Sequence, residues 1–330
     1  MHPVNRLLNM IGLRVVRVPP HQQAAAGAAR KSVVPIRVGP FELLIEPRNP
    51  LFETYLENPS YMAELGRVAA EVHAKYPGMV CVDVGANVGD TAAILRAACP
   101  ARIICVEGDE SVAETLARNA ERIGDVAIVR VFLDERDESR RVNVAKAGWN
   151  STLLPVGSNG HAQASEHGRV VRFSTLDEVL GSSGVDRAAV KLLKIDTEGF
   201  DARVLRGASR VLDEGRPVVL FEYNRENLAA LGEDGLSIFD ALRQRGYRTA
   251  MFWEAQGRFI LGTTLDQSGI LEDLHDYVGY HDGYLSAAQY LDVCVFHETD
   301  EDLAARCLSR ERAERTRPAG SPPDSTPTHG

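Results

Sequence analysis

The chain has 330 residues, of which 44% are hydrophobic and 25% are charged, so it can bury a sizeable core in one large domain. Its net charge of −9 argues against non-specific nucleic-acid binding, which requires clustered lysine and arginine. No apolar run reaches about 18 residues, so we expect no membrane-spanning helix and no stable membrane insertion. The five cysteines show no C-x-x-C spacing, which predicts reduced thiols, no zinc site and an intracellular, cytoplasmic protein.

The N-terminal region is basic and weakly patterned. The first 41 residues contain no Asp or Glu, and residues 21–29 are of low complexity, so residues 1–35 are predicted to be an extension or linker with little regular structure. A transit or membrane-surface segment would have a similar composition, and we favour the extension. The pattern predicts a strand or hairpin over residues 36–46 and a helix over 60–75. Residues 36–77 are therefore expected to pack on the core.

From residue 78 onwards, short apolar runs alternate with segments of helical spacing. This alternation predicts a parallel sheet with helices on both faces. The predicted strands are residues 79–84, 102–106, 127–133, 190–195 and 218–223. The predicted helices are residues 90–98, 111–123, 202–212 and 236–247.

Several further segments complete the core domain, which we place at residues 78–298. Residues 142–144 and 169–173 are expected to form an antiparallel excursion, and a capping box at Thr175 opens a short helix. Later runs are expected to add edge strands at residues 248–253, 258–261 and 292–296. Beyond the core, residues 299–316 mix both charge signs and predict a solvated, charged helix. The Pro/Ser/Gly-rich residues 317–330 predict a disordered tail.

The first predicted strand of the core ends in a glycine turn, Gly85-Ala86-Asn87-Val88-Gly89, which leads into a helix. Glycines allow a tight turn and a close ligand, and the following helix offers free N–H groups to an anion. The spacing is G-x-x-x-G, and Asn87 stands where a dinucleotide site needs its second glycine. Asp83, just before the turn, would repel a pyrophosphate. The turn therefore predicts a small-molecule site of another kind.

Polar residues follow each predicted strand at its carboxyl end, where open parallel sheets bind ligands. In chain order they are Asp83, Glu107, Asp134, Asp196, Glu198, Glu222, Tyr223 and Asn224. Because the carboxyl ends of parallel strands meet at one edge of the sheet, we expect these residues to share a site. Lys194 could steer a substrate anion, and we favour the alternative that it extends from its strand end to solvent.

S-adenosylmethionine fits these residues better than a dinucleotide, because it carries a ribose and an ammonium but no phosphate. Glu107, about 20 residues beyond the turn, can accept both ribose hydroxyls. Asp83 can pair with the ammonium, directly or through water, and N–H groups of the turn can bind the carboxylate. Asp134 either reaches the adenine amino group or is only a turn residue. Asp196 is expected beside the methyl group.

At this point the sequence resembles a known family. The segments VDVGANVGDT, VEGDE, STLDEVL, LKIDTEGFDARVLRGASRVL and RPVVLFEYN are similar, in order and spacing, to the FkbM family of methyltransferases, over residues 78–223. The resemblance implies an α/β, class I methyltransferase Rossmann-like fold with a seven-stranded, mostly parallel sheet. It also implies S-adenosylmethionine as cofactor. The acceptor would be a hydroxyl of a sugar, a glycan or a natural product such as a macrolide.

Methyl transfer to a hydroxyl needs a base, and three carboxylates are candidates: Asp196, Glu198 and Glu222. We favour Asp196, and Glu198 can instead cap the helix that begins near residue 201. Alternatively, the oxygen donors Asp196, Glu222 and Asn224 could bind a divalent metal such as Mg²⁺.

Two other functions remain open at this point. The first is a nicotinamide-dependent oxidoreductase, although the sequence lacks the glycine pattern of a dinucleotide site. The second is a non-catalytic scaffold that binds cofactor, which would be expected to lack the carboxylates.

Overall fold

The computed structural model describes residues 32–147, 150–155, 169–278, 280–281, 284–285 and 289–315. The predicted extension up to residue 31 and the predicted tail from residue 317 lie outside these ranges. The chain divides into two units, Met1–Val33 and Val34–Gly330, and the fold below is that of the second. Within the described ranges, no helix is both long enough and apolar enough to span a membrane.

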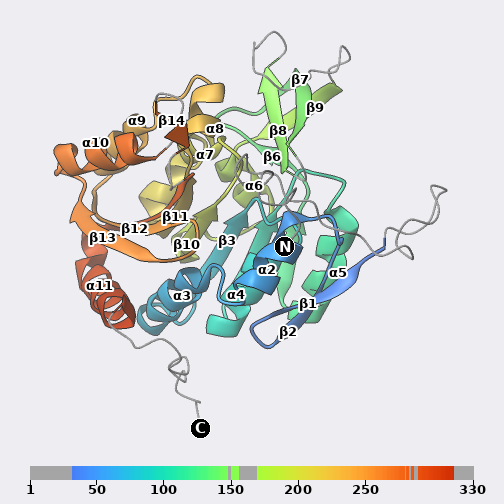
Figure 1. The fold of residues 1–330 in the computed structure, drawn as a ribbon, viewed down its shortest axis with the longest axis horizontal. Helices are drawn as coiled ribbons and strands as arrows, with labels where there is room; N and C mark the ends of the chain where they lie inside the picture. Colours follow the sequence, from blue (N-terminus) through green and yellow to red (C-terminus); the bar gives the residue numbers. More distant parts are fainter. Residues whose placement is uncertain are drawn as a thin grey trace, which may run out of the picture. The chain divides into compact units, whose positions relative to one another are not determined.

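The core of the second unit is one eight-stranded sheet of order β13-β12-β16-β11-β10-β3-β4-β5 (Figure 1). Its strands are β3 (Val80–Val84), β4 (Arg102–Val106), β5 (Val126–Val129), β10 (Val190–Ile195), β11 (Val218–Tyr223), β12 (Tyr247–Glu254), β13 (Phe259–Thr264) and β16 (Leu291–His297). Strands β11 to β5 run parallel, and the other three are joined by antiparallel pairing. The α/β class is confirmed. The strand count of seven is wrong, because β13 adds an eighth strand beyond β12.

Helices cover both faces of the sheet, because its strands are apolar on both sides. Alternate residues of β3 belong to two separate core clusters, with Val82 on one face and Cys81 on the other. The face of Cys81 is covered by α3 (Ala63–Lys75), α4 (Asp90–Ala98), α5 (Ala113–Ile123) and α11 (Glu301–Arg315). The face of Val82 is covered by α6 (Leu176–Ser182), α7 (Asp201–Arg206), α9 (Leu236–Gln244) and α10 (Ser268–Tyr277). Figure 1 shows α3 and α11 on the opposite side of the sheet from α9 and α10.

The predicted solvated helix at the C-terminal end is α11, and one face of it is buried. Leu303, Ala304 and Cys307 pack into the core cluster that contains Cys81. Glu311 accepts hydrogen bonds from Arg67 at 2.5 and 2.8 Å and from Trp253 Nε1 at 2.9 Å. The prediction of a fully solvated helix is wrong. The helix is rich in charged residues, and neither its narrow apolar stripe nor the buried ion pair with Arg67 can be recognised from the sequence of the helix alone.

A second, smaller sheet of order β6-β9-β7-β8 holds the predicted antiparallel excursion. Its strands are β6 (Phe132–Leu133), β7 (Glu138–Ala147), β8 (Asn150–Pro155) and β9 (Arg169–Ser174). The single strand predicted over 127–133 is wrong. The chain leaves the main sheet after Val129, and β6 pairs with β9 instead.

The remaining regular elements are short. They are α8 (Arg225–Ala230), the antiparallel pair β14 (Tyr280–His281) and β15 (Tyr284–Leu285), and the single turns η2 (Arg187–Ala189), η3 (Val211–Gly215) and η4 (Glu298–Asp300). The helix predicted over 202–212 ends earlier than expected, because α7 stops at Arg206 and Gly207 follows it.

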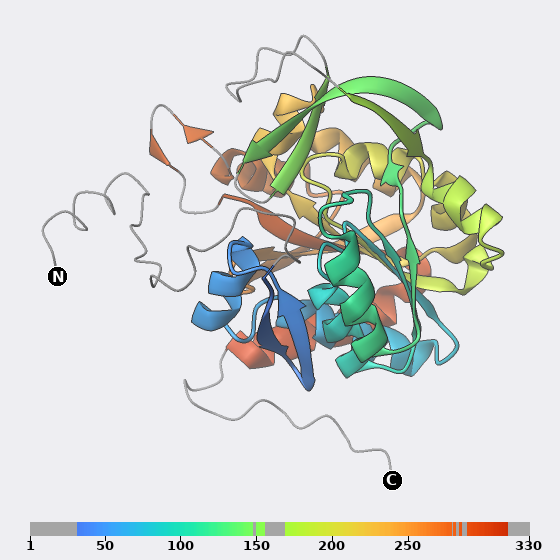
Figure 2. The ribbon, with the colours of Figure 1, turned by 90° about the vertical axis from the view of Figure 1, so that its right-hand side faces the viewer.

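The N-terminal segment folds as the predicted hairpin, β1 (Val34–Val38) and β2 (Phe41–Ile45), followed by an unpredicted helix α2 (Pro50–Glu57). Figure 2 shows the hairpin alongside α5. Asn119 of α5 is fully buried and bonds to the hairpin through both backbone groups of Leu44, each at 2.8 Å. Its amide also donates to the carbonyl oxygen of Val88 in the glycine turn, at 2.8 Å. One side chain therefore joins the hairpin to the turn.

Replacing Asn119 by Ala is expected to lower the free energy of unfolding by about 3 kcal/mol, because it leaves three buried backbone groups unpaired. Urea unfolding followed by circular dichroism measures this loss. The matched control is Arg122→Ala, which removes an exposed hydrogen bond from the same helix to the same hairpin, at Glu42 O. We expect it to change stability by less than about 0.5 kcal/mol. Equal effects of the two substitutions would contradict the prediction.

Candidate active site

A cavity of about 440 Å³ opens at the carboxyl ends of β3, β4, β10 and β11. Its volume suits a ligand of nucleoside size. Of the residues predicted from the sequence, those that line it are Gly85, Asn87, Glu107, Asp196, Glu198 and Glu222. Those that do not line it are Asp83, Ala86, Gly89, Asp134, Tyr223 and Asn224, and the hydroxyl of Tyr223 instead lies 2.6 Å from His275 Nδ1.

The glycine turn forms one wall of the cavity. Gly85 has φ +77°, and a Cβ placed on it would lie 1.8 Å from the carbonyl oxygen of Asp196. Only glycine therefore allows the turn to lie this close to the end of β10. Asn87 has φ +46°, and Gly89, with φ +87°, immediately precedes α4. The buried Oδ1 of Asn87 has no hydrogen-bond partner among the described residues, so it can accept a hydrogen bond from a ligand.

Glu107 follows β4 and lies against the turn. Its two carboxylate oxygens accept hydrogen bonds from the backbone N–H groups of Asn87, at 2.9 Å, and Asp109, at 2.7 Å. Burial raises the pKa of this carboxyl. Each oxygen keeps a further lone pair, so Glu107 can still accept the hydroxyls of a ribose. The turn and Glu107 together fit the ribose-bearing half of S-adenosylmethionine.

Asp83 lies behind the cavity wall and is fully buried. It accepts a hydrogen bond from Thr91 Oγ1 at 2.6 Å, and its other oxygen lies 3.5 Å from Lys194 Nζ. Lys194 Nζ also lies 3.3 Å from Asp196 Oδ2. The predicted exposure of Lys194 is wrong, because its side chain is only 2% exposed and lies between these two carboxylates. Asp83 is therefore separated from the cavity by Lys194, which does line it.

The charge of Lys194 is maintained by its neighbours. Burial acts to lower the pKa of this ammonium, but the carboxylates of Asp196, Asp83 and Asp90 outweigh burial and raise it. Lys194 is the one Lys or Arg among the described residues that line the cavity. It can therefore pair with an anionic group of a ligand such as a carboxylate.

Three carboxyls line the cavity where β10 and β11 end. Asp196 is 35% exposed, whereas the carboxyls of Glu198 and Glu222 are more buried. Burial, together with the charges of Asp196 and Asp201, raises the pKa of Glu198 to about 7, although Asn227 Nδ2 donates a hydrogen bond to it at 3.1 Å. Burial also raises the pKa of Glu222, with the same neighbouring acids contributing. Two carboxyls of the site, Glu198 and Glu222, thus have pKa values above the ordinary range of a glutamate, which suits them to general acid–base chemistry.

Glu198 does not cap the following helix. Helix α7 begins at Asp201, and its N-cap residue, Phe200, makes no side-chain capping bond. Glu198 instead has φ +53°, an uncommon conformation for a residue other than glycine. Its carboxyl lines the cavity. The capping role considered from the sequence is therefore wrong.

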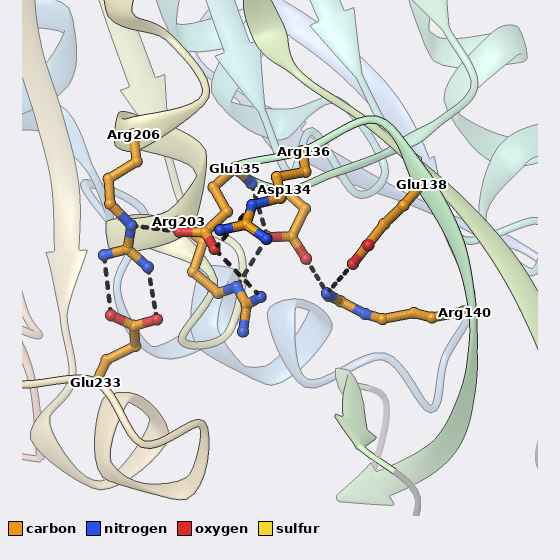
Figure 3. Close-up of polar contacts among 8 residues, drawn as sticks. All are labelled: Asp134, Glu135, Arg136, Glu138, Arg140, Arg203, Arg206 and Glu233. Atoms are coloured by element: carbon orange, nitrogen blue, oxygen red, sulfur yellow. Dashed lines mark hydrogen bonds and ion pairs between the residues drawn. The ribbon is translucent and has the colours of Figure 1, made fainter.

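Asp134 lies outside the cavity, in the ion-pair network of Figure 3. Its carboxylate is 1% exposed and binds Arg140 and, at 2.8 Å, Arg203 Nε. The network continues through Glu135 to Arg206, which forms two hydrogen bonds with Glu233. The structure therefore brings Asp134 to two guanidinium groups and not to the cavity, because the strand before it, β6, belongs to the second sheet.

The oxygen donors predicted to bind a metal are not brought together. Asn224 caps α8, accepting a hydrogen bond from Asn227 N at 3.2 Å, and it does not line the cavity. In the part of the chain that the structure describes, no three His, Cys, Asp or Glu side chains are placed to hold a metal ion. The predicted donor set therefore does not fit a metal ion.

Several residues of the cavity were not predicted from the sequence. Tyr61, which precedes α3, and Tyr290, which precedes β16, bring their hydroxyls to within 3.3 Å of each other. Asp90, at the start of α4, accepts a hydrogen bond from Tyr55 OH at 2.9 Å. An aromatic wall is formed by Phe132, Phe173 and Phe200. For Asp90, the signal in the sequence was a polar residue at the first position of a predicted helix. For the tyrosines, the sequence contained no such signal.

The family model "Methyltransferase FkbM domain" matches residues 83–249, just over half of the chain. The chain belongs to the FkbM family of methyltransferases. The matched segment of this FkbM family member contains the glycine turn, Glu107, Asp196, Glu198 and Glu222. The residues Tyr61 and Tyr290 lie outside it. No protein of curated function matches the chain.

This FkbM family member is also similar to solved structures. A methyltransferase FkbM from Methylobacillus flagellatus shares 18% identity, with 53% of this chain aligned to 40% of that one and a TM-score of 0.35. An O-methyltransferase from Bacillus cereus in complex with SAH shares 10% identity over 75% of this chain and 88% of that one, with a TM-score of 0.38. A precorrin-6y C5,15-methyltransferase from Geobacter metallireducens shares 11% identity over 70% and 87%, with a TM-score of 0.33.

Proposed function

We propose that this protein transfers a methyl group from S-adenosylmethionine to a hydroxyl oxygen of a small-molecule or glycan acceptor. Membership of the FkbM family implies S-adenosylmethionine as the methyl donor. The observation that carries the proposal is a single cavity lined by the glycine turn, Glu107, Asp196, Glu198 and Glu222. We further propose residues 78–298 as the methyltransferase domain, with 36–77 packed on it.

The cofactor would be held by the residues around the turn. Glu107 accepts the ribose hydroxyls, and Oδ1 of Asn87 accepts a hydrogen bond from the cofactor. The backbone N–H groups of Gly85, Ala86, Asn87 and Gly89 already donate to groups of the protein, so the contact first considered between the turn and the cofactor carboxylate is less well supported. Lys194 pairs with the cofactor carboxylate, and buried Asp83 acts through Lys194 by keeping it charged. The role first considered for Asp83, a direct contact with the cofactor ammonium, is less well supported because Asp83 does not line the cavity.

We assign Asp196, Glu198 and Glu222 to the binding and activation of the acceptor. When bound, S-adenosylmethionine supplies a methyl group on a positively charged sulfur. Glu198 takes the proton of the acceptor hydroxyl as the new carbon–oxygen bond forms, and the electron pair of the broken carbon–sulfur bond stays on sulfur. We favour Glu198 over Asp196, because Asp196 is already paired with Lys194, whose Nζ lies 3.3 Å from its carboxylate.

Binding and transfer measurements on the full chain test the proposal. Isothermal titration is expected to show binding of S-adenosylhomocysteine and no binding of NADH. The methyl group of radiolabelled S-adenosylmethionine is expected to appear in a base-stable ether of a hydroxyl compound when the protein is incubated with extracted glycans, glycolipids and polyketides. Binding of NADH without S-adenosylhomocysteine would instead support an oxidoreductase. Binding of S-adenosylhomocysteine with no transfer to any hydroxyl would support a non-catalytic scaffold.

A further inference from the structure

A partly buried carboxyl and a buried one lie directly opposite each other on neighbouring strands of the main sheet. Glu222 of β11 is the register partner of Asp292 of β16 in an antiparallel pair. Side chains of directly opposed residues lie on the same face, with Cβ atoms about 4.5–5.5 Å apart. Asp292 is 4% exposed, and Glu222 lines the cavity. Glu222 therefore faces the cavity, and its partner Asp292 lies in the interior of the protein.

One oxygen of each carboxyl, Oε1 of Glu222 and Oδ2 of Asp292, is buried and has no hydrogen-bond partner among the described residues. Within the same part of the chain, the cation that acts on Asp292 is Lys194, which already pairs with Asp83 and Asp196. The other titratable groups around the pair are Asp196 and Glu198 after β10, Asp201 of α7, Glu64 of α3, and Tyr61 and Tyr290.

These surroundings add negative charge. Glu64 is 1% exposed and also has no hydrogen-bond partner on either carboxyl oxygen among the described residues. Two carboxyls that share a buried site cannot both be ionised near neutral pH, since the negative charge of each raises the free energy of the other. Burial and the neighbouring carboxylates act in the same direction on both groups, raising the pKa of Glu222 and that of Asp292.

We propose that the Glu222–Asp292 pair holds a proton at neutral pH and that Glu222 presents it as a hydrogen-bond donor to an oxygen of the acceptor. This inference rests on the proposed methyl transfer and assigns Glu222 a role other than that of base. A protonated carboxyl cannot take the proton of the hydroxyl, so that proton goes to Glu198. Glu222 keeps its own proton and orients the acceptor. Asp292 is a positioning residue that maintains the protonation of Glu222.

The dependence of kcat on pH separates these roles. For the wild type we expect a fall at high pH, where the pair loses its last proton. Glu222→Gln keeps an N–H donor at every pH, so kcat at pH 7 should stay within about tenfold of wild type and the fall at high pH should disappear. Asp292→Asn removes the like charge, so Glu222 loses its proton more easily and the fall should move to lower pH.

A buried acid elsewhere provides the matched control. Asp300 is 2% exposed and binds Tyr76 and Lys75 away from the cavity, so Asp300→Asn should leave the pH profile unchanged. The fall at low pH, which we assign to Glu198, should be the same in wild type, Glu222→Gln and Asp292→Asn. If Asp292 had only a structural role, Asp292→Asn would change kcat without a shift confined to the fall at high pH.

Infrared spectroscopy tests the proton without turnover. Wild-type protein at pH 8 should show the C=O absorption of a protonated carboxyl, and Asp292→Asn should reduce it. Binding of S-adenosylhomocysteine confirms that each variant is folded. The proposal is overturned if Glu222→Gln binds S-adenosylhomocysteine but has no activity at any pH, if it retains the high-pH fall, or if Asp292→Asn leaves both the profile and the infrared band unchanged. A wild type that transfers no methyl group to any hydroxyl would instead overturn the proposed function.

Discussion

Replacing Glu198 by Gln is expected to lower kcat by roughly 10²–10⁴-fold, because it removes the base that takes the hydroxyl proton. Binding of S-adenosylhomocysteine should remain near normal, since Glu107 and the glycine turn are untouched. The base must be unprotonated to act, and the pKa of Glu198 is raised to about 7. The kcat of the wild type should therefore fall about tenfold for each pH unit below about 7.

Two further variants make this result interpretable. Glu226→Gln alters an exposed carboxylate on α8 and should leave kcat unchanged. Asp196→Asn should reduce kcat less than Glu198→Gln, because Asp196 pairs with Lys194. If Asp196→Asn is inactive while Glu198→Gln keeps most of its activity, Asp196 is the base, as the sequence alone favoured.

Replacing Gly85 by Ala should lower the free energy of unfolding by about 3–5 kcal/mol and abolish binding of S-adenosylhomocysteine. Part of the loss, about 1–2 kcal/mol, comes from a side chain at φ +77°. The rest comes from overlap, because the new methyl group would lie 1.8 Å from the carbonyl oxygen of Asp196 and must displace the end of β10. Urea unfolding measures the stability and isothermal titration measures the binding.

Gly124 provides a control matched in φ. It also has φ +77°, but a Cβ placed on it would meet no atom within 4 Å. Gly124→Ala should therefore cost only the backbone part, about 1–2 kcal/mol, and leave ligand binding intact. If Gly85→Ala were no more destabilising than Gly124→Ala, the close approach between the turn and β10 would not be the reason for glycine at this position.

The parts of the fold that depend on local patterns were predictable from the sequence. The strand at 102–106, the helix at 90–98 and the strands at 190–195 and 218–223 have the predicted limits, because each is an apolar run bounded by turn residues. The Thr175 cap also forms, with Oγ1 accepting a hydrogen bond from Glu178 N. The residues Glu107, Asp196, Glu198 and Glu222 line a single cavity, as their shared position at one edge of the sheet predicted.

Tertiary structure alone decided where the chain changes sheets and which charges meet. The run 127–133 is continuous in composition, yet its end pairs with β9, and Asp134 therefore meets Arg140 and Arg203 instead of the cavity. Lys194 is enclosed because Asp83 of the neighbouring strand β3 lies beside it, in addition to Asp196 of its own segment. The pairs Lys194–Asp83 and Arg203–Asp134 join residues that are far apart in the sequence, so no local pattern records them.

The sequence by itself determined the strand–turn–helix unit at residues 79–98 and the family, because glycine spacing and apolar periodicity act over a few residues. The structure determined the chemistry of each carboxyl. Burial and the charge of neighbours set the proton affinity of Glu198, Glu222 and Asp292, and both depend on which strands lie side by side. Whether a carboxylate at this sheet edge acts as a base, a donor or an ion-pair partner is therefore a property of the folded protein.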